Sequence, residues 1–273
     1  MKEQADARSP DSGDFDEHWH DLLTGDPDSL PGLGKWFRRM PSPPRCKSCG
    51  APFAGPYAPF LRLLRFSPWP LNQQLCRWCY QGIGRQRGGA EIPVSVLFTD
   101  VRGSTTLAEQ MTPSEFRSLL DRFFTTVFVA VDAFHGVIDH IVGDGVMAMW
   151  TPGFGGANHP ELAVEAGRKL VTDMASDPVL GDSLPAGVGV HTGLAWVGVV
   201  GETGAHDFTV LGDVPNTVAR LGSAVGGGEL AISSEIADAA DVQTKASERR
   251  LLNLKGKTEP FEVWIETAQT PNP

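Results

Sequence analysis

The sequence predicts an α+β fold in which a ferredoxin-like domain follows a small cysteine-rich module and an acidic tail. Strand-like and helix-like segments alternate in the order βαββαβ from residue 93 onward, and this is the order of the ferredoxin-like sandwich. All four cysteines fall in two CxxC pairs ahead of those segments. Residues 1–30 hold nine acidic and two basic side chains, whereas residues 31–90 hold ten basic side chains and no acidic ones.

Composition sets the boundaries between these parts. The first segment has few apolar side chains, which is typical of disorder. Prolines at 41, 43 and 44 and the pair Gly88–Gly89 are typical of breaks between domains. The expected parts are a disordered acidic tail over 1–40, a basic module over 41–89, the α+β domain over 90–267 and a frayed C-terminus over 268–273.

The α+β domain is expected to open with a strand and a long helix. Residues Val94–Val101 form a nearly continuous apolar run, which suits a buried central strand. Residues Met111–His135 place apolar side chains at helical spacing. Thr112, Pro113 and Glu115 supply the N-cap, N1 and N3 residues of a capping box.

The later elements follow the same kind of evidence. A Gly-Asp-Gly turn at 143–145 separates two apolar strands, Pro160 stands near the start of a helix, and Asp213 is placed to cap another. The expected elements are strands Val137–Val142 and Val146–Trp150, helix His159–Asp173, strands Gly187–His191, Ala195–Val200 and Phe208–Leu211, helix Val214–Gly222, and strand-like runs ending in LLNLKGK and FEVWIE.

Composition also excludes some classes of protein. The formal net charge of −10 argues against a chain that binds nucleic acid nonspecifically. No apolar run approaches the roughly 20 residues that span a bilayer, and the polar N-terminus is unlike a signal peptide. A cytoplasmic location with no membrane contact is therefore expected.

Two aspartates are candidate metal ligands. Asp100 ends the first buried strand, and the turn Gly103-Ser104-Thr105 that follows can offer backbone N–H groups to a phosphate. Asp144 lies in the Gly-flanked turn of the next hairpin, which the fold places beside the first strand. Two such carboxylates suit Mg²⁺ or Mn²⁺, although taken singly each aspartate also fits a helix cap or a hairpin turn.

A second group of residues can hold a nucleotide. Asn216 and Arg220 are four residues apart on one helical face, and a guanidinium is well shaped for a phosphoryl group. Lys255 in LKGK is a further candidate phosphate ligand. Each of these residues also fits an ordinary solvated surface.

In this order, the motifs resemble one family. FTDVRGST, IVGDGVMAMW, GVHTGLAWVGVVG, TVLGDVPNTVARL and LKGK are similar to the catalytic domain of the class III adenylyl and guanylyl cyclases, from about residue 93 to 266. The resemblance implies an enzyme that forms a cyclic nucleotide and pyrophosphate with two metal ions. It also implies a homodimer in which the metal carboxylates and the Asn/Arg pair of each site come from different subunits.

The resemblance assigns roles by position. Asp100 and Asp144 would bind both metals, and Val101 would add a backbone carbonyl. Asn216 would orient the ribose, and Arg220 would stabilise charge at the α-phosphate. Lys255 would hold the terminal phosphates.

Two positions would recognise the base, and one departs from the family pattern. His140 stands four residues before Asp144, where the family commonly has lysine, and Thr209 stands seven before Asn216. An imidazole can donate to adenine N1 or to guanine O6, so ATP is expected as substrate and GTP stays an alternative. A catalytically degenerate domain that senses a nucleotide or a partner is the other reading, and the altered His140 is the point in its favour.

The module carries Cys46, Cys49, Cys76 and Cys79, with 26 residues between the pairs. In a cytosolic chain this pattern predicts a metal site rather than disulfides. A structural zinc is expected, with Gly50 permitting the turn after the first pair. An iron–sulfur cluster and dithiol chemistry are the alternatives.

The basic charge of the module suggests what it contacts. Docking on the acidic domain or tail of the same chain is expected, and a regulatory protein partner or a nucleic acid are the alternatives.

Overall fold

The computed structural model describes residues 19–25, 33–40, 44–69, 72–83, 88–202, 205–242 and 247–268. Its main feature is an eight-stranded sheet with strand order β4-β5-β3-β6-β8-β10-β9, in which β7 pairs with β6 beside that path. The strands are β3 (Gly88–Val101), β4 (Val137–Val142), β5 (Gly145–Trp150), β6 (Ala186–Glu202), β7 (Ala205–Leu211), β8 (Glu229–Ser233), β9 (Glu248–Leu252) and β10 (Phe261–Thr267).

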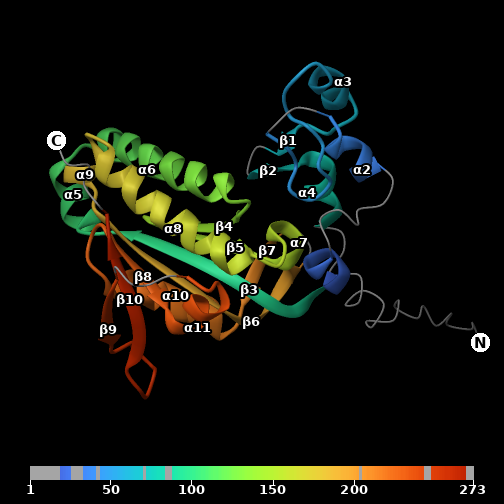
Figure 1. Ribbon diagram of the computed structural model, residues 1–273. Coiled ribbons are helices and arrows are strands. Elements are labelled where there is room, and N and C mark those ends of the chain that lie inside the picture. The colour runs from blue at the N-terminus through green and yellow to red at the C-terminus, as the bar shows by residue number, and fades with distance from the viewer. Residues whose placement is uncertain are drawn as a thin grey trace, which may run out of the picture.

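Helices complete the α+β domain. Figure 1 shows the two longest, α6 and α8, side by side over one face of the sheet. The helices of this domain are α5 (Ser104–Gln110), α6 (Pro113–Ala133), α7 (Pro152–Gly155), α8 (His159–Ser176), α9 (Leu180–Ser183), α10 (Asp213–Ala224) and α11 (Ser234–Ala239). The run β3-α6-β4-β5-α8-β6 confirms the ferredoxin-like α+β fold.

The long helix begins as its sequence indicates. The Thr112 hydroxyl accepts from the Glu115 N–H at 3.3 Å, and the Glu115 carboxylate accepts from the Thr112 N–H at 2.9 Å. Both halves of the capping box are therefore present. Asp213 was expected to cap α10, and this expectation is wrong. Gly212 occupies the N-cap position, and Asp213 is the first residue of the helix. Asp213 instead accepts from Lys257 at 2.6 Å.

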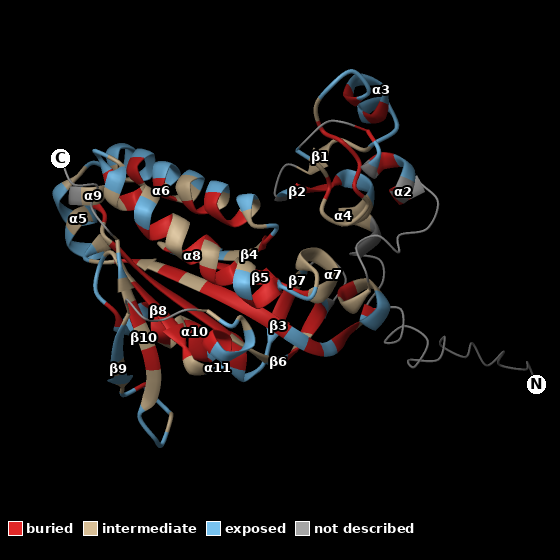
Figure 2. Ribbon diagram, viewed as in Figure 1, coloured by how far each residue is buried: buried red, intermediate tan, exposed pale blue. Residues whose placement is uncertain are grey.

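Apolar side chains fill both faces of the sheet. One cluster joins Leu97, Ala148 and Val190 of the strands to α6 and α8. A second joins Val94, Met149 and Val197 to α10 on the opposite face. Figure 2 shows the central strands buried along most of their length. This double coverage explains why β3 reads as a continuous apolar run.

The expectation of a disordered tail over residues 1–40 fails where the structure describes this segment. Residues 19–24 are helical, and Trp19 and Leu23 are buried in the second apolar cluster. The Trp19 ring stacks on Phe208 of β7 at 5.8 Å. Phe37 of helix α2 (Leu33–Arg38) is buried among the cysteines. Single aromatic residues within a polar segment thus bury enough apolar surface to order it; residues 1–18 lie outside the described part.

The expected break at Gly88–Gly89 coincides with the start of a strand. Strand β3 begins at Gly88 and pairs with β6 from there, with Gly88 opposite Val199. A Cβ atom at Gly89 would stand 2.5 Å from both Trp196 and the Val197 carbonyl oxygen. This glycine permits a close approach of two strands rather than a linker.

The cysteine module has its own small core. It consists of α2, α3 (Ala58–Leu63), β1 (Pro68–Trp69), β2 (Asn72–Cys76) and α4 (Arg77–Ile83). Strands β1 and β2 pair antiparallel. Phe37, Phe53, Leu61 and Leu75 pack around the cysteines.

Candidate active site

The two candidate metal ligands lie next to each other. Asp100 is opposite Gly145 in the pairing of β3 with β5, so the neighbouring Asp144 is carried to the same end of the sheet. Partial burial and the negative charge of Asp144 raise the pKa of Asp100. The charge of Asp144 thus makes ionisation of Asp100 less favourable, and a divalent cation would relieve this repulsion.

Arg102 links these carboxylates to α10. Its Nη1 atom donates to Asp100 Oδ2 at 3.1 Å, its Nε atom donates to the Val225 carbonyl at 3.0 Å, and its Nη2 atom donates to the Gly222 carbonyl. The guanidinium therefore braces the end of β3 that carries Asp100 against the C-terminal end of α10. Sequence reasoning gave Arg102 no role, because the carbonyls that it reaches lie about 120 residues away.

The glycine turn follows directly. Gly103 is the N-cap of α5, with φ of 70°, a conformation that glycine adopts without strain. Ser104 is half-buried and Thr105 is exposed. Gly103 and Thr105 are thus exposed to solvent close to Asp100 in sequence.

Asn216 and Arg220 lie on α10. Asn216 is exposed, and its Nδ2 atom donates to the Gly212 carbonyl at 2.8 Å. The Arg220 guanidinium lies beside Gly256, where a Cβ atom would stand 3.5 Å from Nη2. The exposed Lys255 precedes that glycine, so the loop between β9 and β10 brings Lys255 toward the same helix.

The site residues form two groups within one chain. In the described residues, neither Asn216 nor Arg220 makes a hydrogen bond or ion pair with Asp100 or Asp144. We call the carboxylate group at the end of β3 the first half-site and the amide–guanidinium group on α10 the second half-site.

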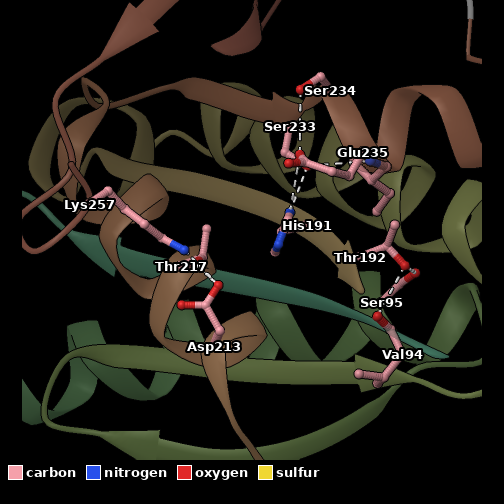
Figure 3. A network of polar contacts seen from close by, with 11 residues as sticks. Val94, Ser95, His191, Thr192, Asp213, Thr217, Ser233, Ser234, Glu235 and Lys257 are labelled. Carbon is pink, nitrogen blue, oxygen red and sulfur yellow. Dashed lines mark hydrogen bonds and ion pairs between the residues drawn. The ribbon is translucent and has the colours of Figure 1, made fainter. Parts of the chain in front are cut away.

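A polar network supports the second half-site (Figure 3). Lys257 donates to Asp213 at 2.6 Å, and Thr217 donates to the same carboxylate oxygen at 3.2 Å. Behind them, the buried His191 ring bonds Ser233 Oγ at 2.8 Å. Desolvation lowers the pKa of His191. The contacts of Asp213 fix the first turn of α10, which carries Asn216.

The two predicted base-recognition residues come together through a third. Thr209 of β7 donates to Asp139 Oδ2 at 3.2 Å, and His140 Nδ1 lies 2.9 Å from the same oxygen. Asp139 was missed from the sequence because strict alternation along β4 would turn it away from His140. The pairing of β4 with β5 is irregular at this point, between Ile138 and His140. Adjacent acidic and basic residues inside an apolar strand are the signal that could have found it.

A pocket of about 680 Å³ lies beside these residues. Its walls come from β2 of the cysteine module and from α6, β4 and β5 of the α+β domain. The lining residues are Gln73, Gln74, Asp121, Phe124, Thr125, Phe128, Ile138, Asp139, His140, Ile141 and Val146.

The four cysteines form one compact cluster. The four Sγ atoms all lie within 4.8 Å of one another, and Cys49 Sγ is 3.8 Å from Cys76 Sγ. Hydrogen bonds from the other thiols, Cys49 first, hold the pKa of Cys46 well below its usual range. The Cys76 N–H donates to Cys46 Sγ at 3.2 Å, and Gly50 has φ of 74°. Four clustered sulfurs, of which those of Cys46 and Cys76 accept backbone N–H bonds, fit a metal ion.

The module docks on the α+β domain through residues that flank its cysteines. Lys47 Nζ forms an ion pair with Asp132 at 2.9 Å. The buried Gln74 side chain donates to the Gly136 carbonyl at 2.8 Å and accepts from the Ile138 N–H at 2.8 Å. This is the contact with the acidic domain that the division of charge predicts.

The described residues include no helix with the length and apolarity needed to cross a bilayer.

Comparisons with known proteins point to one family. Residues 90–267 match the family model described as the adenylate and guanylate cyclase catalytic domain. An uncharacterized protein of Mycobacterium tuberculosis is 32% identical over 183 residues, which are 64% of this chain and 33% of that protein. An adenylate cyclase of Anabaena cylindrica is 32% identical over 132 residues, 47% of this chain and 26% of the relative. The chain thus spans about one third of the length of the curated relatives that it matches first.

Solved structures agree. The guanylyl cyclase Cya2 is 26% identical with a TM-score of 0.59, and the match covers 67% of this chain and 96% of that one. The adenylyl cyclase CyaB from P. aeruginosa is also 26% identical with a TM-score of 0.59, over 67% and 97% of the two chains.

Proposed function

This chain belongs to the class III adenylyl/guanylyl cyclase family, and we propose that it converts ATP to 3′,5′-cyclic AMP and pyrophosphate as a homodimer. The observation that carries this proposal is the pair of half-sites. Asp100 and Asp144 sit together at one end of the sheet, while Asn216 and Arg220 lie on α10 and, within the described residues, form no hydrogen bond or ion pair with them. Two copies of the chain would complete each site.

The residues of the first half-site fit hard cations. Two carboxylates that repel one another and an adjacent backbone carbonyl at Val101 provide the oxygen ligands that Mg²⁺ and Mn²⁺ prefer. When bound, the two cations would act as Lewis acids toward the ribose 3′-hydroxyl and the triphosphate.

The chain's own residues would position the substrate for in-line displacement. The 3′-oxygen forms a bond to the α-phosphorus, the bond from that phosphorus to the pyrophosphate oxygen breaks, and the hydroxyl proton passes to solvent. Asn216 would hold the ribose in line, and Arg220 would stabilise charge on the α-phosphate. Lys255 and the turn at Gly103, Ser104 and Thr105 would bind the terminal phosphates.

The choice between ATP and GTP rests on His140 and Thr209. Because solved adenylyl and guanylyl cyclases match this chain equally well, guanylyl cyclase is the second candidate.

The test incubates the purified full chain with Mn²⁺ and each nucleotide and measures cyclic nucleotide and pyrophosphate. Equal amounts of cyclic AMP and pyrophosphate are expected, with activity nearly abolished in Asp144→Ala and kept in Asp238→Ala, an exposed aspartate on α11. Nucleotide binding without any product would instead support a degenerate sensor.

For the cysteine cluster we propose a structural zinc ion and a regulatory role for the module. The zinc proposal is supported by the sulfur cluster and by the tight turn at Gly50. Purified protein should contain about one zinc per chain and be colourless. Cys46→Ser should lose the metal and melt at a lower temperature. A brown protein with iron and acid-labile sulfide would contradict the zinc assignment.

A further inference from the structure

Asp139 is a buried acid whose hydrogen bonds serve its exposed neighbour. Its side chain has no exposed surface, whereas the His140 side chain is 35% exposed. Asp139 Oδ2 accepts from Thr209 and lies 2.9 Å from His140 Nδ1. Asp139 Oδ1 is buried and has no hydrogen-bond partner within the described residues. The Asp139 carboxylate is thus closed to solvent in this conformation, whereas the His140 imidazole is accessible.

The irregular pairing of β4 with β5 explains how the side chains of two consecutive residues, Asp139 and His140, can contact each other. A bulge breaks the alternation of side chains between the two faces of a strand. Here the register of β4 against β5 shifts between Ile138 and His140, with Asp139 between them. Asp139 therefore reaches both Thr209 on β7 and the ring of the next residue.

The contact between Asp139 and His140 determines which imidazole nitrogen can donate a hydrogen bond to a ligand. An ionised carboxylate only accepts hydrogen bonds, so Nδ1 of His140 must donate to Asp139. Nε2 then accepts when the ring is neutral and donates when the ring is charged. The bond to Asp139 raises the pKa of His140, while burial raises the pKa of Asp139. Among the described residues, Asp207 on β7 also favours the charged ring, and the acidic Asp121 on α6 lines the same pocket as His140.

We propose that Asp139 is a positioning residue that holds His140 as a charged donor, with Nε2 directed at the purine of the substrate. The acceptor would be adenine N1 or guanine O6, because both take one hydrogen bond from a donor at that edge. The pair would thereby replace the lysine that this position commonly holds in the family. This inference rests on the proposed function, which supplies the purine nucleotide.

The proposal predicts a pH dependence in KM rather than in kcat. The ring donates below the raised pKa of His140 and loses this ability as pH increases through it. KM for the preferred nucleotide should therefore increase about tenfold over that range, which is the effect of losing a hydrogen bond from a charged donor. In Asp139→Asn the increase should move to lower pH, because the carboxylate no longer favours the charged ring.

Two variants act as controls in the same assay. In His140→Lys the KM should stay constant over this range, because an ammonium remains charged, and any residual slope reports titration of the substrate. Asp207→Asn removes an exposed carboxylate near the ring. No hydrogen bond between Asp207 and His140 is found in the described residues, so this variant should shift the profile much less than Asp139→Asn.

The outcomes separate this inference from the proposed function. If Asp139→Asn folds and keeps the wild-type KM profile, the positioning role is wrong. A wild-type profile as flat as that of His140→Lys overturns the proposal without any Asp139 variant. If no variant forms product from ATP or GTP, the proposed function fails, and an NMR titration of the His140 ring in the free protein still tests the pair. Its pKa should be lower in Asp139→Asn than in wild type, and an unchanged pKa overturns the pairing.

Discussion

At the scale of single residues, the neighbouring carboxylates of Asp100 and Asp144 reduce the stability of the fold. Asp100 is partly buried and repelled by Asp144, and both effects raise its pKa. The ion pair with Arg102 at 3.1 Å opposes them, but a partly exposed pair of this kind contributes only about 0–1 kcal/mol. Without a cation, the charged Asp100 is therefore unfavourable in the folded state.

Asp100→Asn should separate stability from metal binding. Without cations, the variant should melt at the same temperature as wild type or a few degrees higher, since about 1 kcal/mol shifts the melting temperature by about 2–4 °C in a domain of this size. Addition of Mn²⁺ should raise the melting temperature of wild type and leave that of Asp100→Asn unchanged. Asp238→Asn, on the exposed face of α11, is the control and should respond to Mn²⁺ as wild type does. An equal Mn²⁺ response in Asp100→Asn would remove Asp100 from the metal site.

The sequence predicts the site residues that lie in recognisable motifs. It does not predict residues that are placed by a strand irregularity or by contacts between distant segments. Asp100 and Asp144 were proposed as neighbours, and the register of β3 and β5 confirms their proximity. Asp139 could not be found by periodicity, because a bulge in β4 places it. The contacts of Arg102 join segments too distant in sequence for any local pattern to reveal.

At the scale of elements, β4 is the point where the cysteine module meets the α+β domain. It is an edge strand of the large sheet, so its outer backbone groups need other partners. The Gln74 amide serves as one, since it bonds both the Gly136 carbonyl and the Ile138 N–H. Gln74 stands two residues before Cys76, and Ile138 stands two residues before His140. The contact between Gln74 and Ile138 therefore links the cysteine cluster to the strand that carries His140.

Gln74→Ala should loosen this contact. It leaves two backbone groups of the edge strand without the Gln74 amide, and an unsatisfied buried group costs about 1–3 kcal/mol. Hydrogen exchange at residues 136–141 should become faster, and KM for the nucleotide should rise more than kcat falls. Gln73→Ala is the matched control, because Gln73 is exposed on the same strand. Identical exchange in the two variants would show that Gln74 does not hold β4.

The elements themselves followed from periodicity and caps, with informative exceptions. Helices α6 and α8 and strands β4 and β5 lie where the pattern places them. The Gly88–Gly89 pair, expected as a break, forms the first two residues of β3, because glycine serves close strand packing as well as linkers. The helix at residues 19–24 was missed because its apolar residues stand among acidic ones, and its burial depends on a surface that only the folded sheet provides.

At the scale of the whole molecule, one chain leaves apolar side chains exposed around the proposed half-sites. Ile141 and Val142 of β4 are more than half exposed, as is Leu194 of β6, and Leu211 of β7 is 46% exposed. These strands neighbour or carry the residues assigned to the base and the metals. Exposed apolar surface of this kind fits an interface, and a two-fold axis would place the same surface on both subunits.

The central claim, that each active site takes Asp100 from one subunit and Asn216 from the other, is tested most directly by complementation. Asp100→Ala and Asn216→Ala should each be severely impaired when expressed alone. When the two are co-expressed, about half of the dimers are mixed, and each mixed dimer holds one site with both defects and one with neither. The cyclase activity of the purified mixture should therefore return to roughly a quarter of wild type. Folded, dimeric variants that show no such recovery would contradict the claim.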